Sequence, residues 1–125
     1  MTIVCVDDHP IMLKGLLENI RQVFLDASIF GFERGDEALE FVKDNGCDVL
    51  ISEIELEGTD GLTLARNIKK LNTKVNIIFH TVCDEKEHAR EVLKLKPSGY
   101  LVKPANKEQI DAELRNLRYS SAHVG

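Results

Sequence analysis

The chain has 125 residues, of which 43% are hydrophobic and 30% charged, and this is the size and composition of one globular domain. Its formal charge of −5 argues against direct binding to nucleic acid, which normally requires a basic face. No apolar stretch approaches the ~20 residues of a membrane span, and the N-terminus lacks a signal-peptide pattern. The three cysteines show neither CxxC nor metal-type spacing. We therefore expect a reduced, cytoplasmic, single-domain protein.

The first half of the chain alternates short apolar runs with stretches of helical periodicity. Pro10 follows the first run, and its missing N–H is tolerated in the first turn of a helix. Asn45 and Gly46 form a typical left-handed end for a helix. The pattern predicts strands at residues 3–6, 27–32 and 48–53, and helices at residues 10–24 and 35–45.

The second half continues this alternation after a polar loop that contains two glycines. The fourth helix is more polar than the others, so we expect it to pack least firmly. Asn106 can cap the last helix. The pattern predicts strands at residues 75–81 and 100–102, and helices around residues 64–71, at 84–95 and from 106 to about 117.

Strict alternation of five strands with five helices predicts an α/β fold with a parallel sheet. Such a sheet needs helices on both faces, and its crossover connections are right-handed. We therefore expect a flavodoxin-like three-layer sandwich whose five strands follow the order 2-1-3-4-5. The domain is expected to span residues 1–118, with a polar tail or linker stub at residues 119–125.

Polar side chains follow four of the predicted strands at the point where each strand ends. Asp7 and Asp8 follow the first, and Glu53 the third. Thr81 ends the fourth strand, and Lys103 follows the fifth. Because the carboxyl ends of parallel strands meet at one edge of the sheet, these side chains should lie together. Acids, a hydroxyl and an ammonium in one place suit a divalent metal and a phosphoryl group.

Four motifs, in this order and at this spacing, resemble the receiver domain of two-component response regulators. Any one of them is weak alone, but the set is specific and covers Ile3 to about Leu117. The motifs are VDDHP at residues 6–10, DVLISEI at 48–54 with GTDG at 58–61, IFHT at 78–81, and GYLVKP at 99–104.

The resemblance implies a magnesium site. Asp7 and Asp8 match the acidic pair that holds Mg²⁺ in the family, and the backbone carbonyl of Glu55 matches a further ligand. Glu53, at the phosphoacceptor position, belongs to the same set. Hard oxygen ligands with retained waters are what Mg²⁺ prefers, and we expect binding to be weak.

The resemblance also implies roles for the residues that contact the phosphoryl group. Lys103 matches the lysine that pairs with its oxygens, and Thr81 the hydroxyl that moves to hydrogen-bond it. Tyr100 matches the aromatic that swings inward behind that hydroxyl. The family's Lys-Pro bond is usually cis, so we expect a cis bond between Lys103 and Pro104.

Position 53 departs from the family pattern, which has an aspartate as phosphoacceptor. Glu53 carries its carboxylate one methylene farther into the space that the phosphoryl group would fill. Phosphoryl transfer depends on in-line geometry, so we predict that this chain is not phosphorylated efficiently. The residue can instead imitate the phosphorylated state. A natural pseudo-receiver and a parent chain into which Glu was introduced are both consistent with the sequence.

Simpler interpretations exist for each of these residues. Asp7 and Asp8 by themselves could serve only to cap the first helix. Thr81 and Tyr100 would be ordinary strand residues without the resemblance. His9 and His80 flank the expected site, but no partner at zinc-like spacing accompanies them, so we expect solvent-facing or packing roles. The basic residues Lys69, Lys70 and Lys74 are most simply a solvated face.

These expectations describe a signalling switch without enzymatic turnover, in a two-component phosphorelay and as the regulatory part of a transcriptional regulator. Its expected partners are a sensor histidine kinase, and an output domain, partner protein or second copy that reads the face formed by the fourth helix, fifth strand and fifth helix. A small magnesium-dependent phosphotransferase or phosphatase is the alternative. It is disfavoured because such phosphatases need an aspartate nucleophile and because 125 residues leave little room for a substrate cap.

Overall fold

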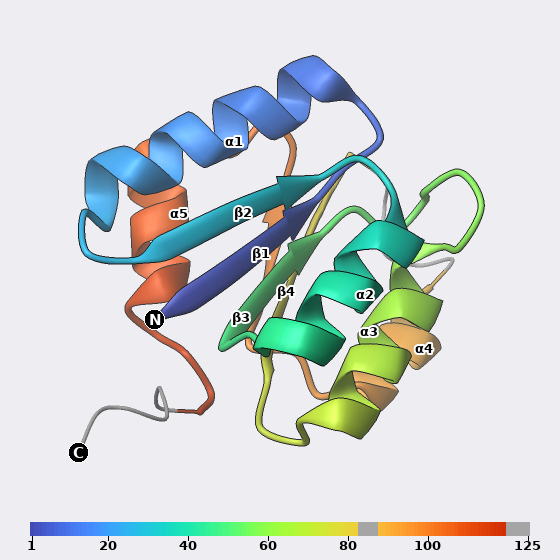
Figure 1. The fold of residues 1–125 in the computed structure, drawn as a ribbon. Helices are drawn as coiled ribbons and strands as arrows, with labels where there is room; N and C mark the ends of the chain where they lie inside the picture. Colours follow the sequence, from blue (N-terminus) through green and yellow to red (C-terminus); the bar gives the residue numbers. More distant parts are fainter. Residues whose placement is uncertain (83–87, 120–125) are drawn as a thin grey trace.

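A computed structural model describes residues 1–82 and 88–119 of the chain (Figure 1). The five strands pair in parallel and form one sheet in the order β2-β1-β3-β4-β5, so the predicted flavodoxin-like topology is confirmed. The strands are β1 (Thr2–Val6), β2 (Ser28–Phe32), β3 (Val49–Ser52), β4 (Asn76–Thr81) and β5 (Gly99–Val102). The helices are α1 (Pro10–Val23), α2 (Gly35–Asn45), α3 (Gly61–Leu71), α4 (Ala89–Lys94) and α5 (Lys107–Leu114).

The local signals in the sequence determine where most helices begin and end. Pro10 occupies the first turn of α1, and Gly46 ends α2 with a positive φ of 73°. The Asp60 side chain accepts a hydrogen bond from the Thr63 N–H at the start of α3. Asn106 and Gln109 form a capping box at the start of α5. The predicted start of the fourth helix, at residue 84, lies outside the described residues.

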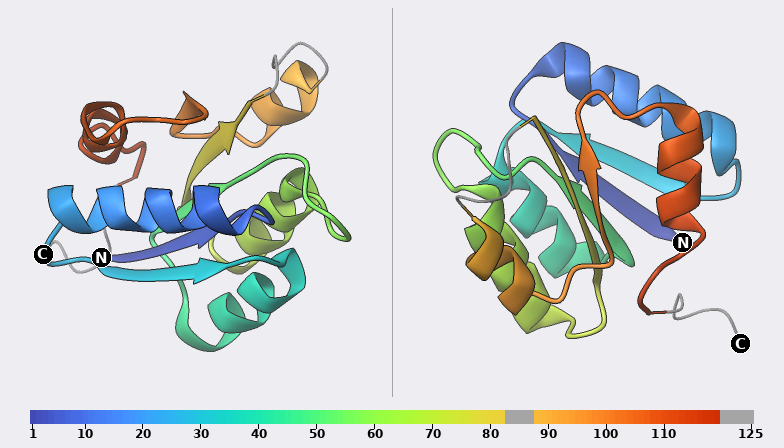
Figure 2. Two further views of the ribbon diagram at one scale, coloured as in Figure 1. Left: turned by 90° about the horizontal axis from the view of Figure 1, so that it is seen from above. Right: turned by 180° about the vertical axis from the view of Figure 1, so that it is seen from behind.

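The sheet lies between two layers of helices (Figures 1 and 2). Helices α1 and α5 cover one face, and α2, α3 and α4 cover the other. Each face has its own hydrophobic core. On the α1 side it contains Leu16, Ile20 and Ile110, and on the other side Leu64 and Val92.

The central strands are the most deeply buried part of the molecule. All residues of β3 and β4 are buried, whereas edge strand β2 has three exposed residues of five. The register aligns Val6 of β1 with Ser52 of β3, and Ser52 with Phe79 of β4. The carboxyl ends of these strands therefore meet at one edge of the sheet, as the sequence predicts. No helix among residues 1–82 and 88–119 is long and apolar enough to cross a bilayer.

Candidate functional site

The ammonium group of Lys103 joins two acids at the carboxyl edge of the sheet. Its Nζ lies 2.7 Å from Oδ2 of Asp7 and 2.7 Å from Oε1 of Glu53, and all three side chains are buried. Burial by itself would lower the pKa of Lys103, but the hydrogen bonds to Asp7 and Glu53 outweigh it and raise that pKa. The lysine is therefore fully charged at neutral pH, and its single positive charge is shared between two carboxylates.

Backbone hydrogen bonds between neighbouring strands fix the three members of this cluster. The N–H of Asp7 donates to Phe32 O at 3.1 Å, and that of Glu53 donates to Val6 O at 3.0 Å. The N–H of Lys103 donates to Thr81 O at 2.9 Å. The cluster is therefore positioned by the sheet itself, with one member from each of three strand ends.

Both oxygens of the Glu53 carboxylate have partners. Oε1 contacts Lys103, and Oε2 accepts a hydrogen bond of 2.7 Å from the N–H of Ile54. The side chain thus turns back onto its own strand end, and its charge faces the lysine. These two contacts fix the orientation of the carboxylate.

Asp8 and His9 form a second, more open part of the site. Oδ2 of Asp8 accepts a hydrogen bond of 3.0 Å from the Glu57 N–H. Nδ1 of His9 lies 3.1 Å from Oδ1 of Asp8 and 3.2 Å from Oδ1 of Asp7. Among the described residues, Asp7, Asp8 and His9 are the group whose ligand atoms lie close enough together to hold one metal ion.

This donor set fits a hard divalent cation in part. The carboxylate oxygens of Asp7 and Asp8 lie close together, and oxygens are the ligands that Mg²⁺ prefers. The Glu53 carboxylate is directed at Lys103 instead of joining that group. The Glu55 side chain lies toward His88, 3.7 Å from its Nε2, whereas the predicted ligand of this residue is its backbone carbonyl.

Thr81 and Tyr100 lie in the two strands that lead to this edge from the β5 side. Thr81 is buried at the end of β4, and Tyr100 is half-buried against the core on the α2–α3 side. The peptide bond between Lys103 and Pro104 is cis, as the resemblance implies.

Two histidines have contacts that sequence reasoning did not assign. His9 touches both aspartates, although about two thirds of its side chain is exposed. His80 is buried, and its Nε2 accepts a hydrogen bond of 3.4 Å from the Ala105 N–H. Burial and the nearby charge of Lys103 lower the pKa of His80 to about 4, so the ring is neutral at pH 7.

The neutral ring of His80 has a defined tautomer. Because a backbone N–H can only donate, Nε2 must be the acceptor and the proton must lie on Nδ1. His80 also lines a cavity of about 80 Å³ with Asn19 and Gly15 of α1 and with Pro104. The ring therefore connects β4 to the loop that follows Lys103. The only signal in the sequence was a polar residue inside an apolar strand.

Comparison with known proteins matches the sequence to one family. Residues 3–115 match the family model described as the response regulator receiver domain. The chain is 31% identical over 116 residues to the uncharacterized transcriptional regulatory protein YesN of Bacillus subtilis, covering 92% of the chain and 32% of that protein. It is 28% identical to the response regulator UvrY of Escherichia coli, covering 99% of the chain and 57% of UvrY. The chain thus spans about a third to just over half of these relatives.

Solved structures agree with the fold. A response regulator receiver domain protein from Clostridium thermocellum superposes with a TM-score of 0.82 at 20% identity, covering 92% of this chain and 91% of that chain. The isolated receiver domain of RcsB from Salmonella enterica superposes with a TM-score of 0.80 at 25% identity, covering 92% and 86% of the two chains. That structure was solved in the presence of the phosphomimetic BeF₃⁻.

Proposed function

Because this chain belongs to the response regulator receiver domain family, we propose that it is a signalling switch in a two-component phosphorelay and the regulatory part of a transcriptional regulator. YesN and YpdB, two relatives, are described as transcriptional regulatory proteins, and both are longer than this chain. The proposed input partner is a sensor histidine kinase or what remains of its pathway. The chain itself would have no enzymatic turnover.

We further propose that Glu53 replaces the family's phosphoacceptor aspartate and that the chain is not phosphorylated there. The observation that carries this proposal is the contact between Glu53 Oε1 and Lys103 Nζ at 2.7 Å. The longer side chain brings its own negative charge to the lysine that would otherwise meet the phosphoryl oxygens. In-line attack needs space beyond the attacking oxygen, and the contacts with Lys103 and with the N–H of Ile54 hold the longer side chain in one orientation.

A charge held permanently at Lys103 would bias the switch toward one state. Thr81 and Tyr100 would transmit that bias to the surface formed by α4, β5 and α5. Two large apolar side chains on this surface, Leu93 and Val102, are well exposed. Exposed apolar side chains of this size support a contact with an output domain, a partner protein or a second copy of the chain.

A weak Mg²⁺ site is proposed at Asp7 and Asp8, with the carbonyl of Glu55 as a further ligand. The two carboxylates support this site, and Mg²⁺ would neutralise charge there. Titration with Mg²⁺ should perturb the amide signals around Asp8, and the perturbation should disappear in Asp8→Ala.

The decisive experiment is incubation with acetyl phosphate and Mg²⁺, followed by intact mass measurement. We expect no adduct on this chain and an adduct of about 80 daltons on Glu53→Asp, because the shorter carboxylate leaves room for the phosphoryl group. Glu53→Gln serves as the matched control, since it keeps the side-chain length and has no nucleophilic oxygen. A stable adduct on the unaltered chain, absent from Glu53→Gln, would contradict the proposal.

A further inference from the structure

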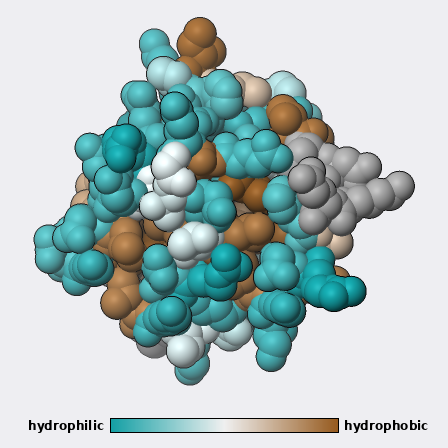
Figure 3. Space-filling model, turned by 90° about the vertical axis from the view of Figure 1, so that its right-hand side faces the viewer, coloured by the Kyte–Doolittle hydropathy of each residue, from teal (hydrophilic) through white to brown (hydrophobic). Residues whose placement is uncertain are grey.

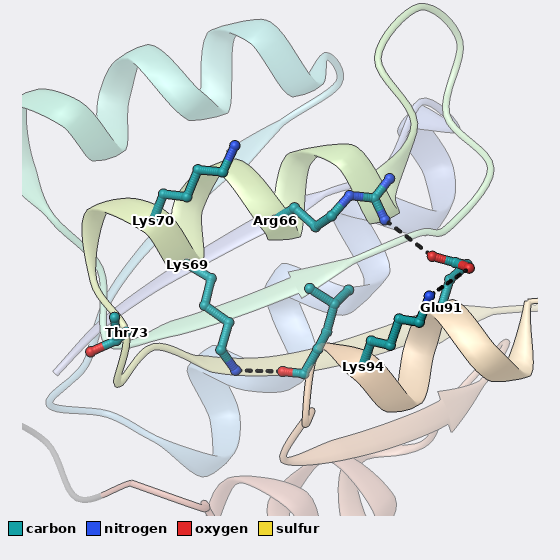
Figure 4. A pocket seen from close by; sticks show the side chains of 7 residues that line it. Arg66, Lys69, Lys70, Thr73, Glu91 and Lys94 are labelled. Carbon is teal, nitrogen blue, oxygen red and sulfur yellow. Dashed lines mark hydrogen bonds and ion pairs between the residues drawn. The ribbon is translucent and has the colours of Figure 1, made fainter.

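A groove of about 370 Å³ lies between α3 and α4, away from the carboxyl edge of the sheet (Figure 4). It opens on the side of the molecule that lies at the right of Figure 1, where hydrophilic side chains cover most of the surface (Figure 3). The aliphatic parts of long basic side chains form much of its wall. The lining residues are Arg66, Lys69, Lys70, Thr73, Glu91, Lys94 and Leu95.

The groove has an excess of positive charge in a chain that is acidic as a whole. Four of its seven lining residues are cationic and one is acidic, against a net charge of −5 for the chain. The ammonium of Lys69 donates a hydrogen bond to the carbonyl of Leu95 and so fixes α3 to the end of α4. Arg66, Lys70 and Lys94 still outnumber the single acid, Glu91.

Glu91 shows where an anion is favoured in this groove. Its Oε2 lies 3.8 Å from a guanidinium nitrogen of Arg66, and its Oε1 lies 3.6 Å from Nζ of Lys94 (Figure 4). Both distances exceed those of direct hydrogen bonds, and each of the three side chains is about half exposed or more. The carboxylate therefore occupies a favourable position without tight pairing, and it blocks only part of the positive field.

We propose that this groove binds a small phosphate-bearing ligand between α3 and α4. Arg66 offers a planar fork of N–H donors and Lys94 a point charge, and both lie toward the position that the Glu91 carboxylate occupies (Figure 4). The side chain of Leu95 and the lysine stems offer contact to an apolar part of the ligand. The volume lies in the range of small-molecule sites, and the net charge of −5 opposes a long polyanion such as nucleic acid.

Such a ligand would connect two helices that follow the candidate switch. Helix α3 starts at Gly61, whose N–H donates a hydrogen bond to the carbonyl of Ile54, directly after Glu53. Helix α4 follows β4, which ends at Thr81. Occupancy would thus give the chain an input that needs no phosphorylation. Binding itself stands apart from the proposed function, and only this regulatory consequence rests on it.

Titration of the whole ¹⁵N-labelled chain with pyrophosphate tests the proposal, with NaCl adjusted to keep ionic strength constant. We expect saturable shifts of amide signals on facing sides of α3 and α4. The double variant Arg66→Gln/Lys94→Gln should weaken binding at least about tenfold, because two charged phosphate contacts are lost. Lys14→Gln, which removes an exposed lysine from α1, should leave the affinity unchanged.

Glu91→Gln gives the sharper result, because it removes a competing carboxylate and keeps the side-chain shape. We expect this variant to bind pyrophosphate several-fold more tightly. Shifts that follow ionic strength alone, shifts that map to another surface, or an unchanged or weaker affinity in Glu91→Gln would each overturn the proposal. None of these readouts depends on acetyl phosphate. A failure of the groove proposal is therefore distinguishable from a failure of the proposal that Glu53 is not phosphorylated.

Discussion

Two groups of opposite charges in the described part of the chain are built in different ways. At the carboxyl edge of the sheet, Lys103 and its two acids are buried and in direct contact. In the groove between α3 and α4, Arg66, Lys94 and Glu91 are close to half exposed or more, and their charged atoms are more than 3.5 Å apart. The first group has one cation between two acids, held in direct contact, whereas the second has two cations for one acid and holds them loosely.

This difference in burial and contact distance gives the two groups different roles, one in folding stability and the other in ligand binding. A buried charge that loses its partner is costly, because water cannot replace the partner. An exposed ion pair is screened by water and salt, so its members are free to exchange partners at little cost. Substitutions in the first group should therefore change folding, and substitutions in the second should change ligand affinity.

Lys103→Met should give the largest effect, because it leaves Asp7 and Glu53 as neighbouring buried carboxylates without a cation. We expect the free energy of unfolding to fall by about 3–5 kcal/mol in urea denaturation. Lys107→Met, at an exposed position that begins α5, is the matched control and should change little. A loss below about 1 kcal/mol in Lys103→Met would mean that water reaches the cluster.

Gly61→Ala tests the connection between the two regions. A Cβ at Gly61 would overlap the backbone carbonyl of Glu53, which cannot move without shifting the end of β3. We expect a loss of about 2–3 kcal/mol, together with shifted amide signals at Ile54 and Lys103. Gly15→Ala, in the middle of α1, is the control, because a Cβ there meets no atom within 4 Å. Equal effects of the two substitutions would refute the close packing of Gly61.

Buried His80 makes the stability of the folded chain depend on pH. Its pKa is about 4 in the folded chain and 6.5 in a free side chain, so folding favours the neutral ring. The stability that comes from this preference is complete above pH 6.5 and is lost as the pH falls toward 4. The loss amounts to about 2–3 kcal/mol.

The measurement for His80 is the difference in unfolding free energy between the parent and His80→Leu at pH 7 and at pH 4. This difference should shrink on acidification, because the leucine variant has no ring to protonate. His80→Gln should retain the Ala105 amide protection in hydrogen exchange, since its side-chain oxygen can still accept. A difference that does not vary with pH would contradict the neutral, buried ring.

Glu91→Gln should give the smallest change in folding. Its two partners lie 3.6 and 3.8 Å away and are well exposed, so we expect the free energy of unfolding to change by less than about 0.5 kcal/mol. The same variant is expected to bind pyrophosphate more tightly. A loss of 2 kcal/mol or more, on the order of a buried pair, would erase the contrast between the two regions.

The fold was predictable because local signals and overall pattern agree in this chain. Apolar runs bounded by Gly46, Asp60 and Asn106 define where elements stop and start, and the short connections admit few topologies. The same rule brought Asp7, Glu53 and Lys103 to one edge of the sheet, where the structure also has them.

The details of the site were not predictable, because they depend on side-chain rotamers and burial. A sequence pattern states that Glu53 ends a strand, but not that its second oxygen turns back to the N–H of Ile54. The interpretation of His80 as packing or solvent-facing left out its hydrogen bond to Ala105. From the sequence, Lys69 and Lys70 were interpreted as a solvated face. The sequence pattern did not predict that α4 lies opposite them and forms the other wall of a groove, because this depends on the packing of the two helices.

The strand order also has a consequence for how the protein is made on the ribosome. Strand β1 leaves the tunnel first, yet it lies between β2 and β3, and β4 and β5 are synthesised later still. The nascent chain can therefore pair β1 with β2 early, while the other edge of β1 waits for β3. Asp7 can pair with Lys103 only after residue 103 has been translated, so this ion pair forms after all five strands have been synthesised.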